Sequence, residues 1–115
     1  MNDKSKEVTL DAFGNPCTTF ESGAIRSSKE GKGRFDLLPA NAIFALARLI
    51  ERGAKQYGDR NWERGIPISS FIDSGLRHAF QASRGDTDEE HLINAAWNFL
   101  CAYETKQTRK EQTTL

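Results

Sequence analysis

Residues 86–105 carry two different stripes of side chains at helical spacing, which predicts a helix that begins at Asp88 and frays after about Thr105. Thr87 and Glu90 have the spacing of a capping box at its start. One stripe is apolar and has the pattern of an ordinary buried face; it comprises Leu92, Ala96, Phe99, Leu100 and Tyr103. The other stripe is polar, with small alanines between its members; it comprises His91, Asn94 and Asn98.

The polar stripe has two interpretations. Imidazole and carboxamide groups that follow the acidic run of residues 86–90 are typical of the wall of a polar site. The alternative is a contact between helices with a few satisfied hydrogen bonds. Both interpretations stay open on the sequence alone.

Two further helices precede this one. The first is expected from Pro39 to Tyr57, because Pro39 suits a first turn and Gly58 follows as a stop. Its predicted buried face comprises Ile43, Leu46, Ala47, Ile50, Ala54 and Tyr57. The second is expected from Ser69 or Ser70 to Arg84, with Gly85 as its stop. Its predicted core face comprises Phe71, Ile72, Leu76, Ala79 and Phe80.

The second helix also carries a small polar stripe, formed by Ser74, His78 and Gln81. If the second and third helices pack antiparallel across the short turn at Gly85, this stripe faces His91, Asn94 and Asn98. A single buried histidine is more often structural than a ligand, but two facing polar stripes favour a site.

The rest of the chain divides into three parts. Residues 1–33 are polar and lack periodicity, so we expect a flexible or extended arm without strands, with a turn at residues 13–16. Residues 34–105 form the helical domain, and residues 106–115 a polar tail. The loop between the first two helices contains Trp62, which either plugs the end of the helical core or stacks on a ligand ring.

The composition narrows the function classes. Lys and Arg number 16 and Asp and Glu number 16, a balance that argues against a partner such as a nucleic-acid polymer or an anionic membrane. No apolar run is long enough to span a bilayer and the N-terminus lacks the apolar core of a signal peptide, so a cytoplasmic location is expected. The hydrophobic fraction of 37% is low for a self-sufficient core. We therefore predict an all-α antiparallel bundle of three main helices, completed by oligomerisation to a dimer or tetramer.

Clustered carboxylates beside histidine and asparagine are typical of hard-metal chemistry, in which oxygen atoms hold Mg²⁺ or Mn²⁺ and the metal in turn holds phosphates. No serine or cysteine lies in the context of a nucleophile. The corresponding reaction is attack of a metal-activated water on a phosphoanhydride.

Several short blocks resemble a family of small phage and prophage proteins, the dATP/dGTP diphosphohydrolase-like proteins, which are related to the MazG-like all-α nucleotide pyrophosphohydrolases. These blocks are Phe35-Asp36-Leu37-Leu38-Pro39, Gly53-Ala54-Lys55-x-Tyr57-Gly58-x-x-Asn61-Trp62, Arg77-His78 and His91-Leu92-x-Asn94-Ala95-Ala96-Trp97-Asn98. The resemblance covers about residues 34–104. It implies a helical oligomer in the bacterial host cytoplasm that converts a (deoxy)nucleoside triphosphate to the monophosphate and pyrophosphate with Mg²⁺.

The resemblance and the acidic helix start together suggest roles for individual residues. The metal ligands would be Asp86, Glu89 and Glu90, and the catalytic residues Glu51, Glu90 and His91. The nucleotide would be bound by Lys55, Asn61, Trp62, Arg77, His78, Asn94 and Asn98, with Asn61 and Trp62 at the base.

One departure from the resembling enzymes supports a second hypothesis. MazG-like enzymes hold their metals with a Glu-x-x-Glu pair and a Glu-x-x-Asp pair, whereas the second pair here corresponds to His91 and Asn94, and no clean first pair exists. Neutral ligands weaken Mg²⁺ binding unless the carboxylates of residues 86–90 compensate. The alternative function is therefore a non-catalytic nucleotide-binding protein, for instance a phage protein that sequesters a host signalling nucleotide.

Overall fold

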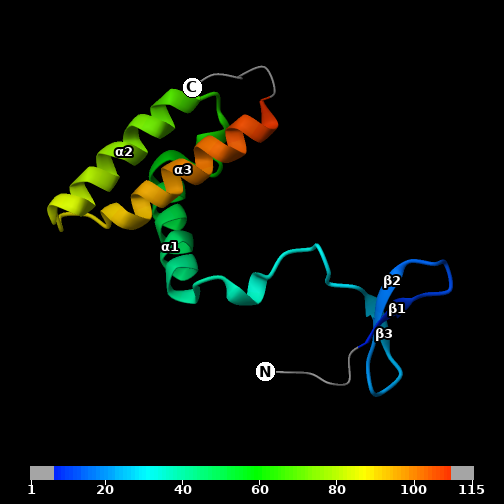
Figure 1. The fold of residues 1–115 in the computed structure, drawn as a ribbon. Coiled ribbons are helices and arrows are strands. Elements are labelled where there is room, and N and C mark those ends of the chain that lie inside the picture. The colour runs from blue at the N-terminus through cyan, green and yellow to red at the C-terminus, as the bar shows by residue number, and fades with distance from the viewer. Residues whose placement is uncertain (1–6, 110–115) are drawn as a thin grey trace. The chain divides into compact units, whose positions relative to one another are not determined.

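The computed structural model describes residues 7–109, which fall into two compact units that divide between Leu38 and Pro39 (Figure 1). Within residues 7–109, no helix combines the length and the apolar character needed to cross a membrane.

The first unit contains a three-stranded antiparallel sheet, so the expectation of an arm without strands is wrong. Its strands are β1 (Glu7–Leu10), β2 (Pro16–Thr19) and β3 (Ile25–Ser27), in the order β1-β2-β3. Leu10 pairs with Pro16, and Thr18 pairs with Arg26. Threonine and isoleucine favour strands, but these strands have only three or four residues each and are too short to show a clear alternation.

The turn between β1 and β2 lies where the sequence predicts one. The Asp11 carboxylate accepts hydrogen bonds from the backbone N–H groups of Phe13 and Asn15, each at 2.9 Å. Gly14 has φ of 80°, a conformation that costs glycine little. Cys17 and Thr18 of β2 are buried. The short 3₁₀ helix η1 (Phe35–Leu37) ends this unit.

The second unit consists of three helices, as predicted. They are α1 (Ala40–Tyr57), α2 (Ile68–Arg84) and α3 (His91–Thr108), with the short 3₁₀ helix η2 (Asn61–Glu63) between α1 and α2. Helices α2 and α3 form an antiparallel hairpin along which most of the packing occurs, whereas α1 makes a smaller contact with α3 (Figure 1). Gly85 ends α2 in the left-handed conformation, as its predicted role as a stop requires.

The start of α3 differs from the prediction. The helix begins at His91 rather than Asp88, and its N-cap position is Glu90, which makes no side-chain capping hydrogen bond. The capping box of Thr87 and Glu90 is therefore wrong. The acidic residues 86–90 lie in the turn before the helix, where their side chains are available for other contacts.

The core of the helical unit lies near the open end of the α2–α3 hairpin. Ile68, Phe71, Cys101 and Ala102 form the buried cluster, and Trp62 packs against it. Trp62 meets Trp97 edge to face, with ring centroids 5.9 Å apart and ring planes at 79°. Of the two interpretations of Trp62, this packing supports the one in which the residue closes the end of the helical core.

The predicted apolar stripe of α3 turns outward, whereas that of α2 is divided, because Phe71 is buried and Ile72 packs against the core as predicted while Leu76 and Phe80 are exposed. Leu92 is 77% exposed and Phe80 is 72% exposed, and Leu76, Leu100 and Tyr103 are also exposed. The two helices instead meet along small residues and histidines, among them Gly75, His78, His91 and Ala95, all buried. None of the residues of α1 is buried either, so its predicted buried face is wrong for the single chain.

Candidate functional site

A pair of buried histidines joins α2 to α3. The Nδ1 atoms of His78 and His91 lie 2.9 Å apart, and the two residues are 6% and 2% exposed. This contact confirms that the polar stripes of the second and third helices meet at His78 and His91, whereas Asn94 of the same stripe lines a cavity against α1. A neutral imidazole carries one N–H, so one Nδ1 donates and the other accepts.

The second ring nitrogen of His91 is also engaged. His91 Nε2 donates to Asp88 Oδ1 at 2.8 Å, so the chain Asp88–His91–His78 runs from an exposed carboxylate to a buried imidazole. This hydrogen bond lowers the pKa of Asp88. Burial, and then the nearby Arg77 charge, lower the pKa of His78, so His78 is neutral at pH 7.

A second carboxylate lies beside this chain in the turn between α2 and α3. Asp86 accepts hydrogen bonds from Arg84 at both carboxylate oxygens, and this contact lowers the pKa of Asp86. Asp86, Asp88 and His91 each place one potential metal ligand atom within 4.8 Å of the others. The turn therefore brings two ionised carboxylates, of Asp86 and Asp88, close to the buried imidazole of His91.

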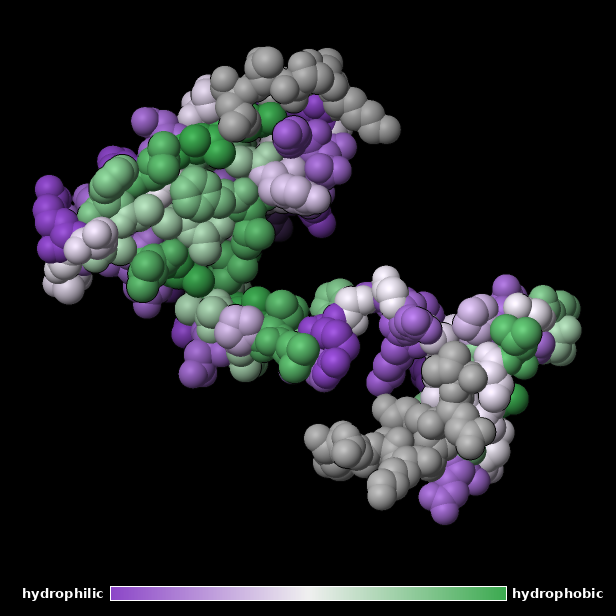
Figure 2. Space-filling view, viewed as in Figure 1, coloured by the Kyte–Doolittle hydropathy of each residue, from purple (hydrophilic) through white to green (hydrophobic). Residues whose placement is uncertain are grey.

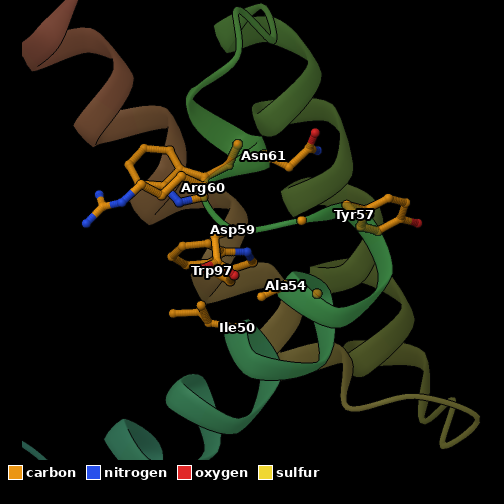
Figure 3. Close-up of a pocket in the computed structure, with 10 residues that line it drawn as sticks. Ile50, Ala54, Tyr57, Asp59, Arg60, Asn61 and Trp97 are labelled. Atoms are coloured by element: carbon orange, nitrogen blue, oxygen red, sulfur yellow. The ribbon is translucent and has the colours of Figure 1, made fainter.

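Two adjoining cavities run between α1 and α3, and we call them together the α1–α3 groove. The first, the aromatic cavity of about 490 Å³, is lined by residues of α1, of the following loop and of α3 (Figure 3). Its lining includes Tyr57, Asp59, Arg60, Asn61, Trp62 and Trp97. The second, the charged cavity of about 780 Å³, includes Arg52, Gln56, Glu89, Glu90 and Asn94. Both are lined by Gly53, Tyr57 and Trp97, so they adjoin at these residues.

The charged cavity also connects to the turn between α2 and α3. Glu89 and Glu90 line it, and they line a third cavity of about 450 Å³ together with Asp86, Thr87 and His91. Arg52 Nη2 lies 3.5 Å from Glu90 Oε2, which places one cation among these acids. Aromatic rings, one arginine and a row of carboxylates therefore follow each other along one side of α3.

Gly53 shows why the groove is open at its middle. A Cβ atom at this position would meet no atom within 4 Å, and the residue lines both cavities. No protein group approaches the backbone here, so the absence of a side chain leaves space in the groove.

The structure brings together most of the residues that the sequence analysis singled out. Asn61 and Trp62 line the aromatic cavity; Glu89, Glu90 and Asn94 line the charged cavity; and Asp86 and His91 line the cavity beside it. His78 lies behind His91 in the buried pair. The amide group of Asn94 donates to the backbone oxygen of Glu90 at 3.0 Å.

Four predicted residues lie elsewhere. Glu51 and Lys55 form an exposed ion pair at 4.0 Å, on the side of α1 opposite to its groove-lining residues by helical geometry. Arg77 donates to Gln81 at 3.3 Å and lines a different cavity with Phe80 and Arg84. The Asn98 amide donates to the backbone oxygen of Asn94 at 2.9 Å.

Sequence reasoning missed two groups that the groove brings into the site. Arg52 is one of several cations on α1, and no local pattern distinguishes it. Trp97 belongs to one of the sequence blocks that carry the family resemblance, but the sequence predicts no binding role for it, although it lines both cavities of the groove. The partnership of Asp88 with His91 is not a helical i,i+3 pair, because Asp88 lies in the turn before α3, and only the folded turn brings the two side chains together.

Comparison with known proteins gives one match. A protein-family model described as "dATP/dGTP diphosphohydrolase, N-terminal" matches residues 22–114, which is most of the chain. No curated protein and no solved structure matches the chain.

Proposed function

This chain belongs to the family described as dATP/dGTP diphosphohydrolase, N-terminal, and from that premise we propose that it hydrolyses a deoxynucleoside triphosphate to the monophosphate and pyrophosphate. The observation that carries the proposal is that the aromatic cavity adjoins the charged cavity at Trp97. A nucleotide has the same division into an aromatic base and a charged phosphate chain.

The aromatic cavity would take the base. Trp62, Trp97 and Tyr57 are among the residues that line it, and aromatic side chains bind bases through stacking, whatever the base. The Asn61 side chain offers both a donor and an acceptor, and Asp59 offers acceptors only. These polar groups can distinguish one base edge from another.

The charged cavity would take the phosphates. Arg52 is the cation of its lining, and a guanidinium can bind two phosphate oxygens at once. The carboxylate of Glu90, 3.5 Å from Arg52, would accept a proton from the attacking water. Glu51 has no part in this version of the site, because it lies with Lys55 on the opposite side of α1.

The acids of the same cavity fit a hard divalent cation. Glu89 and Glu90 are exposed and offer only oxygen atoms, which are the ligands that Mg²⁺ prefers. We propose that these two side chains hold Mg²⁺ or Mn²⁺ against the phosphates. When bound, such an ion neutralises phosphate charge and lowers the pKa of a coordinated water.

Pyrophosphate release from dATP, dGTP, dCTP and dTTP in the presence of Mg²⁺ or Mn²⁺ tests the proposal. We expect turnover by the wild type, and a loss of at least about 100-fold in Glu90→Gln, in line with the contribution of a general base. Arg52→Gln removes the phosphate contact and should raise KM. Glu104→Gln, an exposed acid near the other end of α3, is the matched control and should behave as wild type. Absence of turnover with every nucleotide would reject the proposal.

One observation favours a second candidate, which is nucleotide binding without cleavage. His91 and Asn94 are neutral at positions where the resembling enzymes carry carboxylates, and the Asn94 amide is engaged by its own helix. A sequestering protein would bind the nucleotide in EDTA and release it intact. Recovery of a monophosphate, or binding that requires the metal, would reject this candidate.

A further inference from the structure

The cluster of Asp86, Asp88 and His91 has a composition that the proposed phosphate chemistry does not use. Its ligand atoms lie within 4.8 Å of one another, and His91 Nε2 lies 2.8 Å from Asp88 Oδ1. The nitrogen ligand of the cluster is buried, because the His91 side chain is 1% exposed. Asp88 lies at the protein surface, where its side chain is 70% exposed. A buried imidazole below two carboxylates distinguishes this cluster from ordinary surface acids.

The mixture of nitrogen and oxygen ligands favours a first-row transition-metal ion over Mg²⁺. Mg²⁺ prefers oxygen, whereas Mn²⁺, Co²⁺ and Zn²⁺ also accept imidazole nitrogen, with affinity that rises along the first transition row. Two atoms bound side by side to one ion at about 2.1 Å are roughly 3.0 Å apart at a right angle and roughly 3.4 Å apart at the tetrahedral angle. His91 Nε2 and Asp88 Oδ1, now hydrogen-bonded at 2.8 Å, would therefore move slightly apart as a bound ion replaces the proton between them.

His78 supplies the support that a metal-binding histidine needs. Imidazoles that bind metals usually donate their other N–H to a second group, which fixes the tautomer and the ring orientation. His78 Nδ1 lies 2.9 Å from His91 Nδ1 and can accept that N–H. On binding of a cation at His91 Nε2, the two neutral rings would still carry two protons, now on His91 Nδ1 and His78 Nε2.

Arg84 opposes cation binding, and this gives the inference a distinctive consequence. Its guanidinium donates to both oxygens of Asp86. Each carboxylate oxygen has further acceptor capacity, so Asp86 can keep this contact and still bind an ion. The positive charge of Arg84 would nevertheless repel the cation at short range.

We propose that Asp86, Asp88 and His91 form a binding site for a first-row transition-metal dication, such as Mn²⁺, Co²⁺ or Zn²⁺, and that His78 is its positioning residue. The site is separate from the Mg²⁺ of the proposed hydrolysis, which Glu89 and Glu90 would hold. It does not rest on the nucleotide activity, and it can be measured without nucleotide.

Co²⁺ is the probe, because its visible absorption reports a nitrogen-containing site directly. The full chain, free of any histidine tag and stripped with EDTA, is titrated with Co²⁺ by calorimetry and by absorption spectroscopy. We expect one Co²⁺ per chain, a visible absorption band, and no displacement by an equal concentration of Mg²⁺. Asp88→Asn, at an exposed position, should weaken binding at least about tenfold, as should His78→Gln.

Arg84→Gln should bind Co²⁺ more tightly than wild type, a gain that no merely structural role of the turn predicts. Glu104→Gln is the control and should bind as wild type. The proposal is overturned if the wild type binds no Co²⁺, if Asp88→Asn binds as tightly as wild type, or if Mg²⁺ displaces Co²⁺ at equal concentration. An Arg84→Gln variant that binds no more tightly would equally count against it.

Discussion

At the scale of single residues, the side chains with the most unusual environments are buried and polar or weakly polar. His78 and His91 satisfy each other across the seam between α2 and α3, so neither is an unpaired polar group in the interior. Cys101, in contrast to the two histidines, packs as a small apolar residue in the cluster with Ile68 and Phe71. The same helix seam thus contains a polar contact near the turn and an apolar core at its other end.

Burial raises the pKa of the Cys101 thiol to about 12, and this predicts an unreactive thiol. In Cys17→Ser protein, where Cys101 is the remaining cysteine, alkylation at pH 8 should be slow when the protein is folded and fast in urea. Stability should also depend on pH, because a pKa raised in the folded state favours folding below the unfolded pKa of about 9. That stability is lost as the pH rises from about 9 to 12, with a slope of up to about 1.4 kcal/mol per pH unit.

Cys101→Ala provides the comparison, because tyrosine and lysine groups titrate over the same range. The free energy of unfolding of Cys101→Ala should decline less steeply with pH than that of the wild type. Equal slopes in the two proteins, or rapid alkylation of the folded protein, would show that the thiol is not protected.

At the scale of elements, two glycines within helices have opposite surroundings. A Cβ atom at Gly75 of α2 would lie 2.6 Å from Cε1 of Phe99 of α3, whereas one at Gly53 of α1 would meet nothing within 4 Å. Gly75 is therefore required by the close approach of α2 to α3. Gly53 has no structural requirement, and its cost to the helix is consistent with a role in keeping the groove open.

These surroundings predict opposite effects on stability. Gly53→Ala should stabilise the protein by about 0.5–1 kcal/mol through helix propensity, while weakening nucleotide binding in the groove. Gly75→Ala should destabilise by about 1–3 kcal/mol, because overpacking at Phe99 exceeds the gain in propensity. Urea denaturation followed by the helical circular dichroism signal measures both.

The double variant Gly75→Ala with Phe99→Ala identifies the cause. If the ring of Phe99 is the obstacle, adding Gly75→Ala to Phe99→Ala should cost much less than adding it to the wild type. A Gly75→Ala protein that is as stable as Gly53→Ala would mean that the two helices separate without cost.

At the scale of the whole molecule, the helical unit exposes a large amount of apolar surface. Figure 2 shows hydrophobic surface gathered over the helices on the face that it draws. The exposed apolar side chains of this unit include Ile43, Phe44, Leu76, Phe80, Leu92, Leu100 and Tyr103. Stable monomers rarely expose so many large apolar residues together, and we propose that a second copy of the chain covers them.

The proposed assembly predicts that the wild type sediments as a dimer or tetramer. Introducing charge with Phe80→Glu and Leu92→Glu should shift the protein to monomer in analytical ultracentrifugation, because a buried carboxylate without a partner is costly. Phe13→Glu is the matched control, since Phe13 is 90% exposed in the sheet-containing unit and should leave the assembly unchanged. A monomeric wild type at micromolar concentration would contradict the proposal.

Local patterns in the sequence were sufficient for the number of helices, for most of their ends and for the pairing of His78 with His91. Helical periodicity, proline at a helix start and glycine at a helix stop act within one or two turns, so they can be recognised without the fold. The same patterns predicted a shared site beside the acidic turn, where Asp86, Glu89, Glu90 and His91 do lie together.

The face that each helix turns inward could not be predicted in this way. Apolar periodicity favoured Leu92 and Phe80 for the interior, yet the helices meet through Gly75, Ala95 and the two histidines, whose small size and mutual hydrogen bond permit a close approach. The strands of residues 7–27 depend on pairing between segments and leave little local signal. The groove depends on which side chains of α1 and α3 lie close together in the fold. For this reason the sequence alone did not identify Arg52 and Trp97 as residues that line it.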